Sequence, residues 1–190
     1  MPLAHVRRIM SLAALVSLVA ARADAQMGPS PQCPAEQKNQ FAFLVGQWVG
    51  TVYDLKTDHP GAPPTDSVPG ITARTIARAL FSGCALSEQW HFEDHGVVEG
   101  EAEILRAFDA ASGTWAYDLV TSRLEHVRFE GRRMGDRWVF EHNLPGAGGS
   151  LVRLSWVPTS FGYSEQISRS ADGGRTWTET RHINFKPASD

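Results

Sequence analysis

A regular succession of short segments with strand character limits the folds open to this chain. Apolar and polar residues alternate within the segments, and short turns, most of them with glycine, separate one segment from the next. Ten strands are expected, over residues 47–55, 71–81, 85–93, 98–109, 114–122, 124–132, 137–143, 151–157, 162–168 and 177–185. This spacing predicts an all-β protein, a roughly ten-stranded up-and-down antiparallel barrel or a sandwich. The barrel is favoured because a closed sheet has no open edges.

The segment before the first strand predicts how one end of the barrel is closed. It starts near Pro34 and ends in the apolar residues 41–44, FAFL, which indicates one or two helical turns. Gly46 then ends the helix, and the first strand starts at Gln47. We therefore expect a short helix that caps one end of the barrel, with Trp48 packed beneath it.

Residues 56–70, between the first two expected strands, are rich in proline, glycine and polar side chains. This composition predicts a long loop. Long loops in compact domains often form the lid or rim of a binding site. Two interpretations stay open, a rim of this kind and a solvated insertion without a role.

The first 25 residues have the three parts of a secretory signal peptide. Arg7 and Arg8 form the positive region, residues 9–21 the apolar region, and residues 23–25, Ala-Asp-Ala, a cleavage site. The apolar region is shorter than the roughly 20 residues that a membrane-spanning helix needs. We therefore expect export, to the periplasm or the extracellular space. Residues 26–40 then form an N-terminal segment with the cap, and 41–187 one barrel domain.

The expected exported chain is moderately acidic. Without residues 1–25 it has 15 basic and 20 acidic residues, a formal charge of −5. It has no basic run and no later apolar run of membrane-spanning length. Neither nucleic acid nor membrane insertion is therefore expected of it.

Both cysteines, Cys33 and Cys84, belong to the expected exported part. An even number of cysteines in an oxidising compartment favours a disulfide, which would pin the N-terminal segment to the barrel. The alternative is two unrelated thiols. A catalytic cysteine is not expected, because neither residue has a histidine near it in the sequence.

Alternation indicates which side chains share a face of a strand. One set is Leu86, Glu88, Trp90 and Phe92, and another is Trp138, Phe140 and His142. Glu88 is the exception in its set, since a buried carboxylate is costly unless it is paired or hydrogen-bonded. Arg153, Arg169 or Arg181 on a facing strand is the expected partner. Two interpretations stay open, a structural ion pair and a group that orients a ligand.

Four motifs, in order, resemble an exported bacterial family of unassigned function. They are FAFLVGQWVG at residues 41–50, GCALSEQW at 83–90, AFDAASGTW at 107–115 and SADGGRTW at 170–177. The resemblance covers nearly all of the expected exported chain. It implies a barrel of the calycin type, similar to lipocalins, fatty-acid-binding proteins and the haem-binding nitrobindins, and it implies no particular activity.

The last of these motifs also resembles the Asp-box pattern, S-x-D-x-G-x-T-W. That resemblance implies a hairpin turn in which Asp172 and the glycines fix the backbone while Trp177 packs beneath it. A single copy indicates a structural turn and no catalytic role.

Two arrangements of histidine bear on metal and cofactor binding. His91 and His95 are four residues apart, but on a strand they would lie about 13 Å from each other, so no metal site is expected. Similarity to nitrobindins implies an axial haem ligand in the last strand, where His182 stands. Alternation places His182 with Thr178, Thr180 and Asn184, and if that face points outward His182 is only solvated.

We expect a non-enzymatic protein that binds a small, apolar or amphipathic molecule inside the barrel. The sequence has no H-E-x-x-H, G-x-S-x-G or phosphate-binding lysine loop. The candidate ligand contacts are Glu88, Trp90, His142, Arg153 and Gln166, with Glu88, Arg153 and Gln166 deepest. The alternatives are a haem protein that uses His182 and a barrel packed with tryptophan that acts through a protein partner. An acid/base pair of Glu88 and His142 is a further hypothesis.

Overall fold

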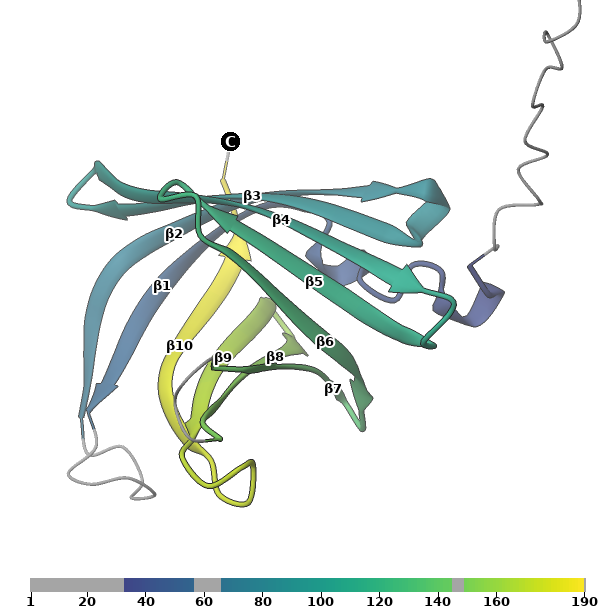
Figure 1. Cartoon of the computed structure of the whole chain (residues 1–190). Coiled ribbons are helices and arrows are strands. Elements are labelled where there is room, and N and C mark those ends of the chain that lie inside the picture. Colours follow the sequence, from purple (N-terminus) through teal and green to yellow (C-terminus); the bar gives the residue numbers. More distant parts are fainter. Residues whose placement is uncertain (1–32, 57–65, 145–148, 190) are drawn as a thin grey trace, which may run out of the picture. The chain divides into compact units, whose positions relative to one another are not determined.

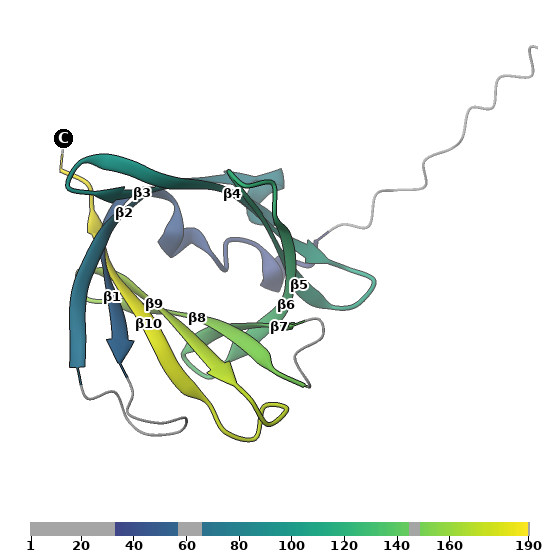
Figure 2. The same ribbon diagram turned by 60° about the vertical axis from the view of Figure 1, so that its left-hand side comes forward.

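Ten strands form one closed antiparallel barrel in which each strand pairs with its sequence neighbours and the last pairs with the first (Figures 1 and 2). The structure is a computed structural model that describes residues 33–56, 66–144 and 149–189. The expected signal peptide and residues 57–65 of the expected loop lie outside the described residues. The predicted all-β barrel is confirmed.

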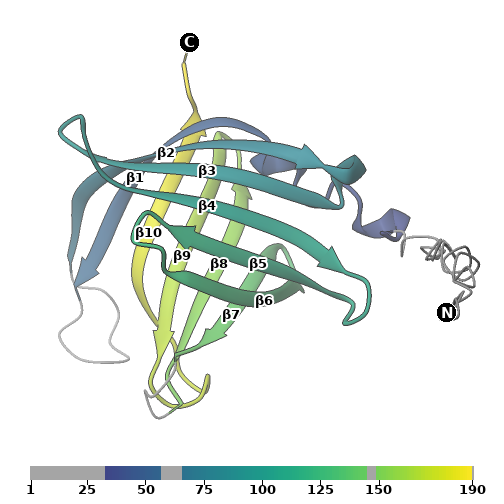
Figure 3. The same cartoon turned by 45° about the horizontal axis from the view of Figure 1, so that its top comes forward.

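The strands follow one another with no crossover, as Figure 3 shows for β2 to β5. They are β1 Gly46–Lys56, β2 Asp66–Leu80, β3 Ala85–Asp94, β4 Val97–Asp109, β5 Thr114–Thr121, β6 His126–Met134, β7 Arg137–Asn143, β8 Leu151–Thr159, β9 Gly162–Ser170 and β10 Thr178–Pro187. In the described part of the chain three short 3-10 turns accompany them, η1 Ala35–Gln37, η2 Ala42–Leu44 and η3 Phe81–Gly83.

Alternation and tight turns explain the local structure. In β3, Leu86 and Trp90 are buried in the barrel interior while Gln89 between them is exposed. The β3–β4 hairpin turns at His95 and Gly96, whose φ angles are +48° and +82°. Positive φ at both central residues is what a two-residue hairpin loop of the favoured hand requires.

The expectation that all of residues 56–70 form a loop was wrong at its ends. β1 continues to Lys56 and β2 begins at Asp66, so that Pro69 pairs with Tyr53 beside a register shift in β1. The pairing of β2 with β3 ends at Thr72. At Pro69, β2 therefore pairs with β1 alone, and no backbone N–H is needed for a second neighbouring strand. Proline is tolerated in a sheet at such edge positions.

The 3-10 turns η1 and η2 lie across one end of the barrel (Figure 2). Phe41 and Leu44 are 3% and 1% exposed. The ring of Phe41 lies 4.8 Å from that of Trp115 and 4.4 Å from that of Trp138, between ring centroids. Trp48 donates from its indole N–H to the Leu44 carbonyl over 2.8 Å. The predicted cap, with Trp48 against it, is confirmed.

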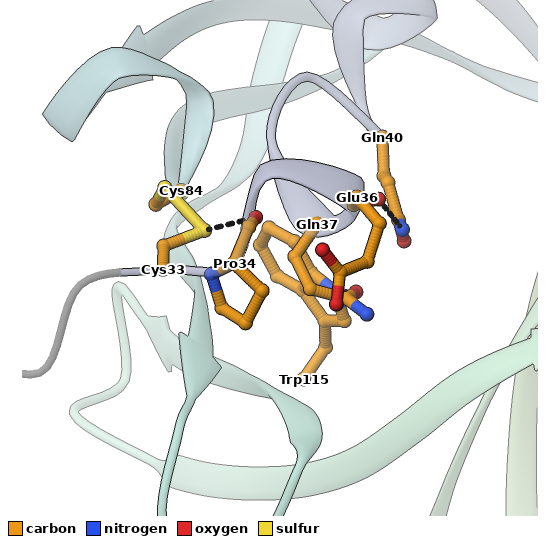
Figure 4. The surroundings of a disulfide bond; sticks show 7 residues. All are labelled: Cys33, Pro34, Glu36, Gln37, Gln40, Cys84 and Trp115. Atoms are coloured by element: carbon orange, nitrogen blue, oxygen red, sulfur yellow. Dashed lines mark hydrogen bonds between the residues drawn. A yellow bond between two sulfur atoms is a disulfide. The ribbon is translucent and has the colours of Figure 1, made fainter.

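A disulfide joins Cys33 to Cys84, as predicted, with Cα atoms 5.9 Å apart (Figure 4). It ties the start of the cap to the segment between η3 and β3. Beside it the Asn39 N–H donates to the Gly83 carbonyl over 3.0 Å. A Cβ atom on Gly83 would lie 2.1 Å from the Asn39 side chain, so this close approach requires glycine. The cap is thus held by a covalent bond and by backbone contact.

The Asp-box segment forms the turn that its pattern implies. The Asp172 carboxylate accepts from the backbone N–H groups of Arg175 and Thr176 over 3.0 and 2.9 Å. The Thr176 N–H, together with the hydroxyl groups of Thr176 and Ser170 that also donate to this carboxylate, holds the pKa of Asp172 well below its usual value. Trp177 donates to the Gly174 carbonyl over 3.0 Å, which closes the turn.

Replacement of both cysteines, Cys33→Ala with Cys84→Ala, should lower the free energy of unfolding. The two residues are 51 apart in sequence, and in the chain-entropy model the loss for such a loop is about 4 kcal/mol. Chemical denaturation followed by far-UV circular dichroism measures it. The single Cys33→Ala variant is the control and should lose as much, because it already lacks the cross-link. An unchanged free energy of unfolding in the double variant would contradict this assignment.

Candidate functional site

A buried ion pair lies in the middle of the barrel. Arg106 of β4 and Glu88 of β3 are 0% and 1% exposed at their side chains, and Arg106 Nε lies 2.8 Å from Glu88 Oε1. Glu88 pairs in register with Ile104, so Arg106, two residues further on, projects from the same face. Trp90 donates its indole N–H to Glu88 Oε2 over 3.3 Å. Burial raises the pKa of Glu88, and the Arg106 charge and the Trp90 hydrogen bond oppose that rise.

Aromatic rings surround the Arg106 guanidinium. Its central carbon lies 4.0 Å from the centroid of Trp156, 4.9 Å from that of Tyr117 and 5.3 Å from that of Phe41. Cations are attracted to the faces of such rings, most strongly when water is excluded. Arg106 therefore joins the cap, through Phe41, to the centre of the barrel.

A second carboxyl, that of Glu165 in β9, is also buried in the interior. Glu165 is 4% exposed and lies opposite Trp156 in the β8–β9 ladder. Trp156 donates its indole N–H to Glu165 Oε2 over 2.9 Å. Burial is the largest cause that raises the pKa of Glu165 to about 7, and the charge of Glu88 raises it further. Arg106, the Trp156 hydrogen bond and Arg181 lower it in part.

An open cavity of about 410 Å³ lies on the side of this group away from the cap. It is lined by Trp90, Phe92, Glu99, Gly100, Glu101, Ala102, Ile104, Tyr117, Leu119, Thr121, Ser122, Arg123, Glu125, Phe129, Val152, Leu154, Glu165, Ile167, Arg181 and Ile183. Neither Glu88 nor Arg106 lines it. Of its four acidic residues only Glu165 is buried.

Arg181 lies at the mouth of the cavity and has a partner there. Its Nε lies 2.6 Å from Oδ1 of Asp54, which stands opposite it in the β1–β10 ladder. Both side chains are partly exposed, at 39% and 57%. Their charges compensate each other outside the buried part of the site.

The structure brings together two of the predicted ligand contacts. Glu88 and Trp90 face inward, and Trp90 lines the cavity. His142 contacts Phe129 at 5.3 Å between ring centroids, and its Nδ1 donates to the Arg128 carbonyl over 2.8 Å. His142 is not among the lining residues of the cavity.

The prediction that Arg153 and Gln166 lie deep inside was wrong. Arg153 pairs with Glu141 over 2.6 Å and lies 3.7 Å from the ring centroid of Trp177. Gln166 accepts from Ser155 over 3.4 Å. In their strands these residues alternate with the inward ones, so they lie on the outer face. The alternating pattern separates two faces without telling which is the inner one.

The prediction for the partner of Glu88 was also wrong. Arg153, Arg169 or Arg181 was expected, and the residue that pairs with Glu88 is Arg106. Arg106 and Glu165 were both missed. A usable signal existed in each strand, since Arg106 follows Ala102 and Ile104 at alternate positions and Glu165 stands between Tyr163 and Ile167. A charged residue among inward apolar ones is the same signal that marked Glu88.

His182 lies on the outer face of the barrel. Its ring lies 4.8 Å from that of Tyr53, and its Nδ1 lies 3.4 Å from Oε1 of Glu179. A register shift between Glu179 and Arg181 puts Glu179 on the same outer face as His182, although strict alternation would place it on the other face. In this position His182 presents no nitrogen to the interior.

The comparisons and the other site types add no further candidate. Neither a scan against protein-family models nor a search of curated proteins found a match. Among the residues that the structure describes, no group of three or more histidine, cysteine or acidic side chains is placed to hold a metal ion. In the same residues, no helix combines the length and the apolar character needed to cross a bilayer.

Arg106→Met should lower the free energy of unfolding by about 3 to 5 kcal/mol, because it leaves Glu88 buried without its counter-charge. Adding Glu88→Gln should restore most of this loss, since the amide still accepts from Trp90 and no charge is left. Chemical denaturation of both variants measures it. Arg74→Met, which breaks the exposed pair with Glu93, is the control and should cost less than about 1 kcal/mol. Equal losses at the two sites would show that burial of the Arg106–Glu88 pair has no energetic consequence.

Glu165 should make stability depend on pH. Its folded pKa of about 7 lies above the ordinary value of 4.5, so as pH rises from 4.5 the unfolded chain loses the proton first and the folded state is destabilised. The difference between the two pKa values corresponds to a loss of roughly 3 kcal/mol in the free energy of unfolding. This loss is complete above about pH 7. Measured by denaturation, Glu165→Gln should gain about that much relative to the wild type between pH 4.5 and pH 8. Glu103→Gln, on the outer face, should show no such window.

Proposed function

We propose that this protein is exported and binds a small, mostly apolar molecule in the barrel cavity without chemical conversion. The main support for the proposal is the open cavity of about 410 Å³ with largely apolar walls. Small-molecule sites are usually preformed pockets of about 300 to 1,000 Å³ with a few polar groups. A disulfide between Cys33 and Cys84 is compatible with export.

The interior is divided between a packed half and an open half, and this favours ligand binding over a barrel that acts only through its surface. Trp115, Trp138 and Trp156 fill the half next to the cap and are at most 4% exposed. The cavity begins beyond the Arg106 group. Most of its walls belong to paired strands, and Ser122, Arg123 and Glu125 of its lining belong to the turn between β5 and β6. A preformed pocket binds with little cost of ordering.

The position of the acidic groups favours binding over catalysis. Glu88 is engaged with Arg106 and does not line the cavity, and neither does His142. An acid/base pair would need both side chains within reach of a bound substrate. Haem bound inside the barrel through His182 is disfavoured in the same way, because that side chain lies outside.

The cavity should bind the uncharged fluorescent probe N-phenyl-1-naphthylamine, whose emission rises in apolar surroundings. Ala102→Phe should weaken its binding at least about tenfold, because Ala102 is an inward-facing lining residue and the added ring would occupy the cavity. Leu105→Phe places the same ring on the outer face, where Leu105 is 42% exposed, and should leave binding unchanged.

Native mass spectrometry of the protein purified under mild conditions would complement this titration, since a bound mass that disappears on denaturation identifies the natural ligand. Equal probe binding by the wild type and Ala102→Phe, or no binding of the probe by either, would contradict the proposal.

A further inference from the structure

The charged groups inside the barrel are unequal in number. Glu88 and Glu165 are two carboxyl groups, and Arg106 is the one guanidinium buried with them in the described part of the chain. Arg106 Nε and Nη2 lie 2.8 and 3.4 Å from the two oxygens of Glu88. In this contact the Glu88 carboxylate neutralises the charge of the Arg106 guanidinium. The interior therefore has one carboxyl more than it has cations.

The carboxyl outside this ion pair is the one that faces the cavity. Glu165 lines the cavity, whereas Glu88 does not, and within the described residues no ion pair involves Glu165. The charged and titratable groups that act on it are Glu88 from β3, Arg106 from β4, Tyr117 from β5, Tyr163 from β9 and Arg181 from β10. Both phenols stay neutral, because burial raises their pKa values well above 10. Arg181 is engaged with Asp54 at the mouth.

The walls of the cavity that Glu165 lines have the chemistry that suits a cation. Trp90, Phe92, Tyr117 and Phe129 all line the same cavity as Glu165. Ring faces and a carboxylate together are the usual recognition elements for ammonium groups, in particular quaternary ones. A ligand carboxylate would meet the opposite situation in the buried part of the cavity, since Glu88 already neutralises the deep guanidinium there. The other two cations of the lining, Arg123 and Arg181, are at least partly exposed.

We propose that the natural ligand is a cationic amphiphile, whose ammonium group binds between Glu165 and the aromatic rings of the cavity while its apolar part extends toward the mouth. This rests on the proposed function, that the cavity is a ligand site. The apolar part would contact Leu119, Val152 and Ile167, which lie along the cavity wall. The exposed charged residues of the lining are Glu99, Glu101, Arg123 and Glu125, three acidic and one basic, so negative charge is in excess there and attracts cations to the opening.

Displacement of N-phenyl-1-naphthylamine by three probes of equal chain length tests the ligand class. The probes are octyltrimethylammonium, octanol and octanoate. At pH 8.5 the cation should bind about tenfold more tightly than octanol, and octanoate more weakly than octanol. Lowering the pH from 8.5 to 5.5 should weaken the binding of the cationic probe at least about tenfold, because a proton on Glu165 competes with the ammonium group. The quaternary group itself does not titrate.

Glu165→Gln should remove both the preference for the cation and its pH dependence, while it keeps the hydrogen-bond acceptor for Trp156. Glu103→Gln makes the same change of net charge on the outer face and should retain both. If the naphthylamine probe binds but the wild type does not prefer the cation, or prefers octanoate, the ligand class is wrong and the cavity remains a binding site. If the naphthylamine probe itself does not bind, the proposed function fails.

Discussion

The interior of the barrel is arranged around the buried charge of Arg106. A guanidinium does not lose its proton in a protein, so its place in the barrel requires a counter-charge and surroundings that tolerate a cation. Glu88 supplies the counter-charge from the neighbouring strand, and Trp156, Tyr117 and Phe41 supply ring faces. Since Phe41 belongs to the cap, the position of the cap and the position of the ion pair are linked.

Trp156 connects this structural group to the cavity. Its ring lies 4.0 Å from the guanidinium of Arg106, and its N–H donates to Glu165 over 2.9 Å. The packed half of the barrel thereby orients the one buried carboxyl that faces the open half. The ion pair stabilises the fold, and the carboxyl left over from it gives the cavity its proposed selectivity.

The errors at the site have a common physical origin. Arg153, Gln166 and His182 were candidate contacts, and all three lie on the outer face. Strand alternation has a period of two, so it separates two sets of side chains without saying which set is buried. In β10 the register shift between Glu179 and Arg181 also breaks the alternation itself. The charged residues among apolar neighbours, Arg106 and Glu165, carried a better signal than polarity alone.

Local patterns in the sequence were enough to predict the all-β barrel, the short cap, the disulfide and the Asp-box turn. These patterns are the spacing of strands and turns, an apolar run ended by glycine, a pair of cysteines, and an eight-residue motif. Three features of the site became known from the folded barrel alone: which face is inner, that Arg106 is the partner of Glu88, and that Glu165 faces an open cavity. These depend on the register between strands, which is set by packing across the whole barrel and which no local pattern contains.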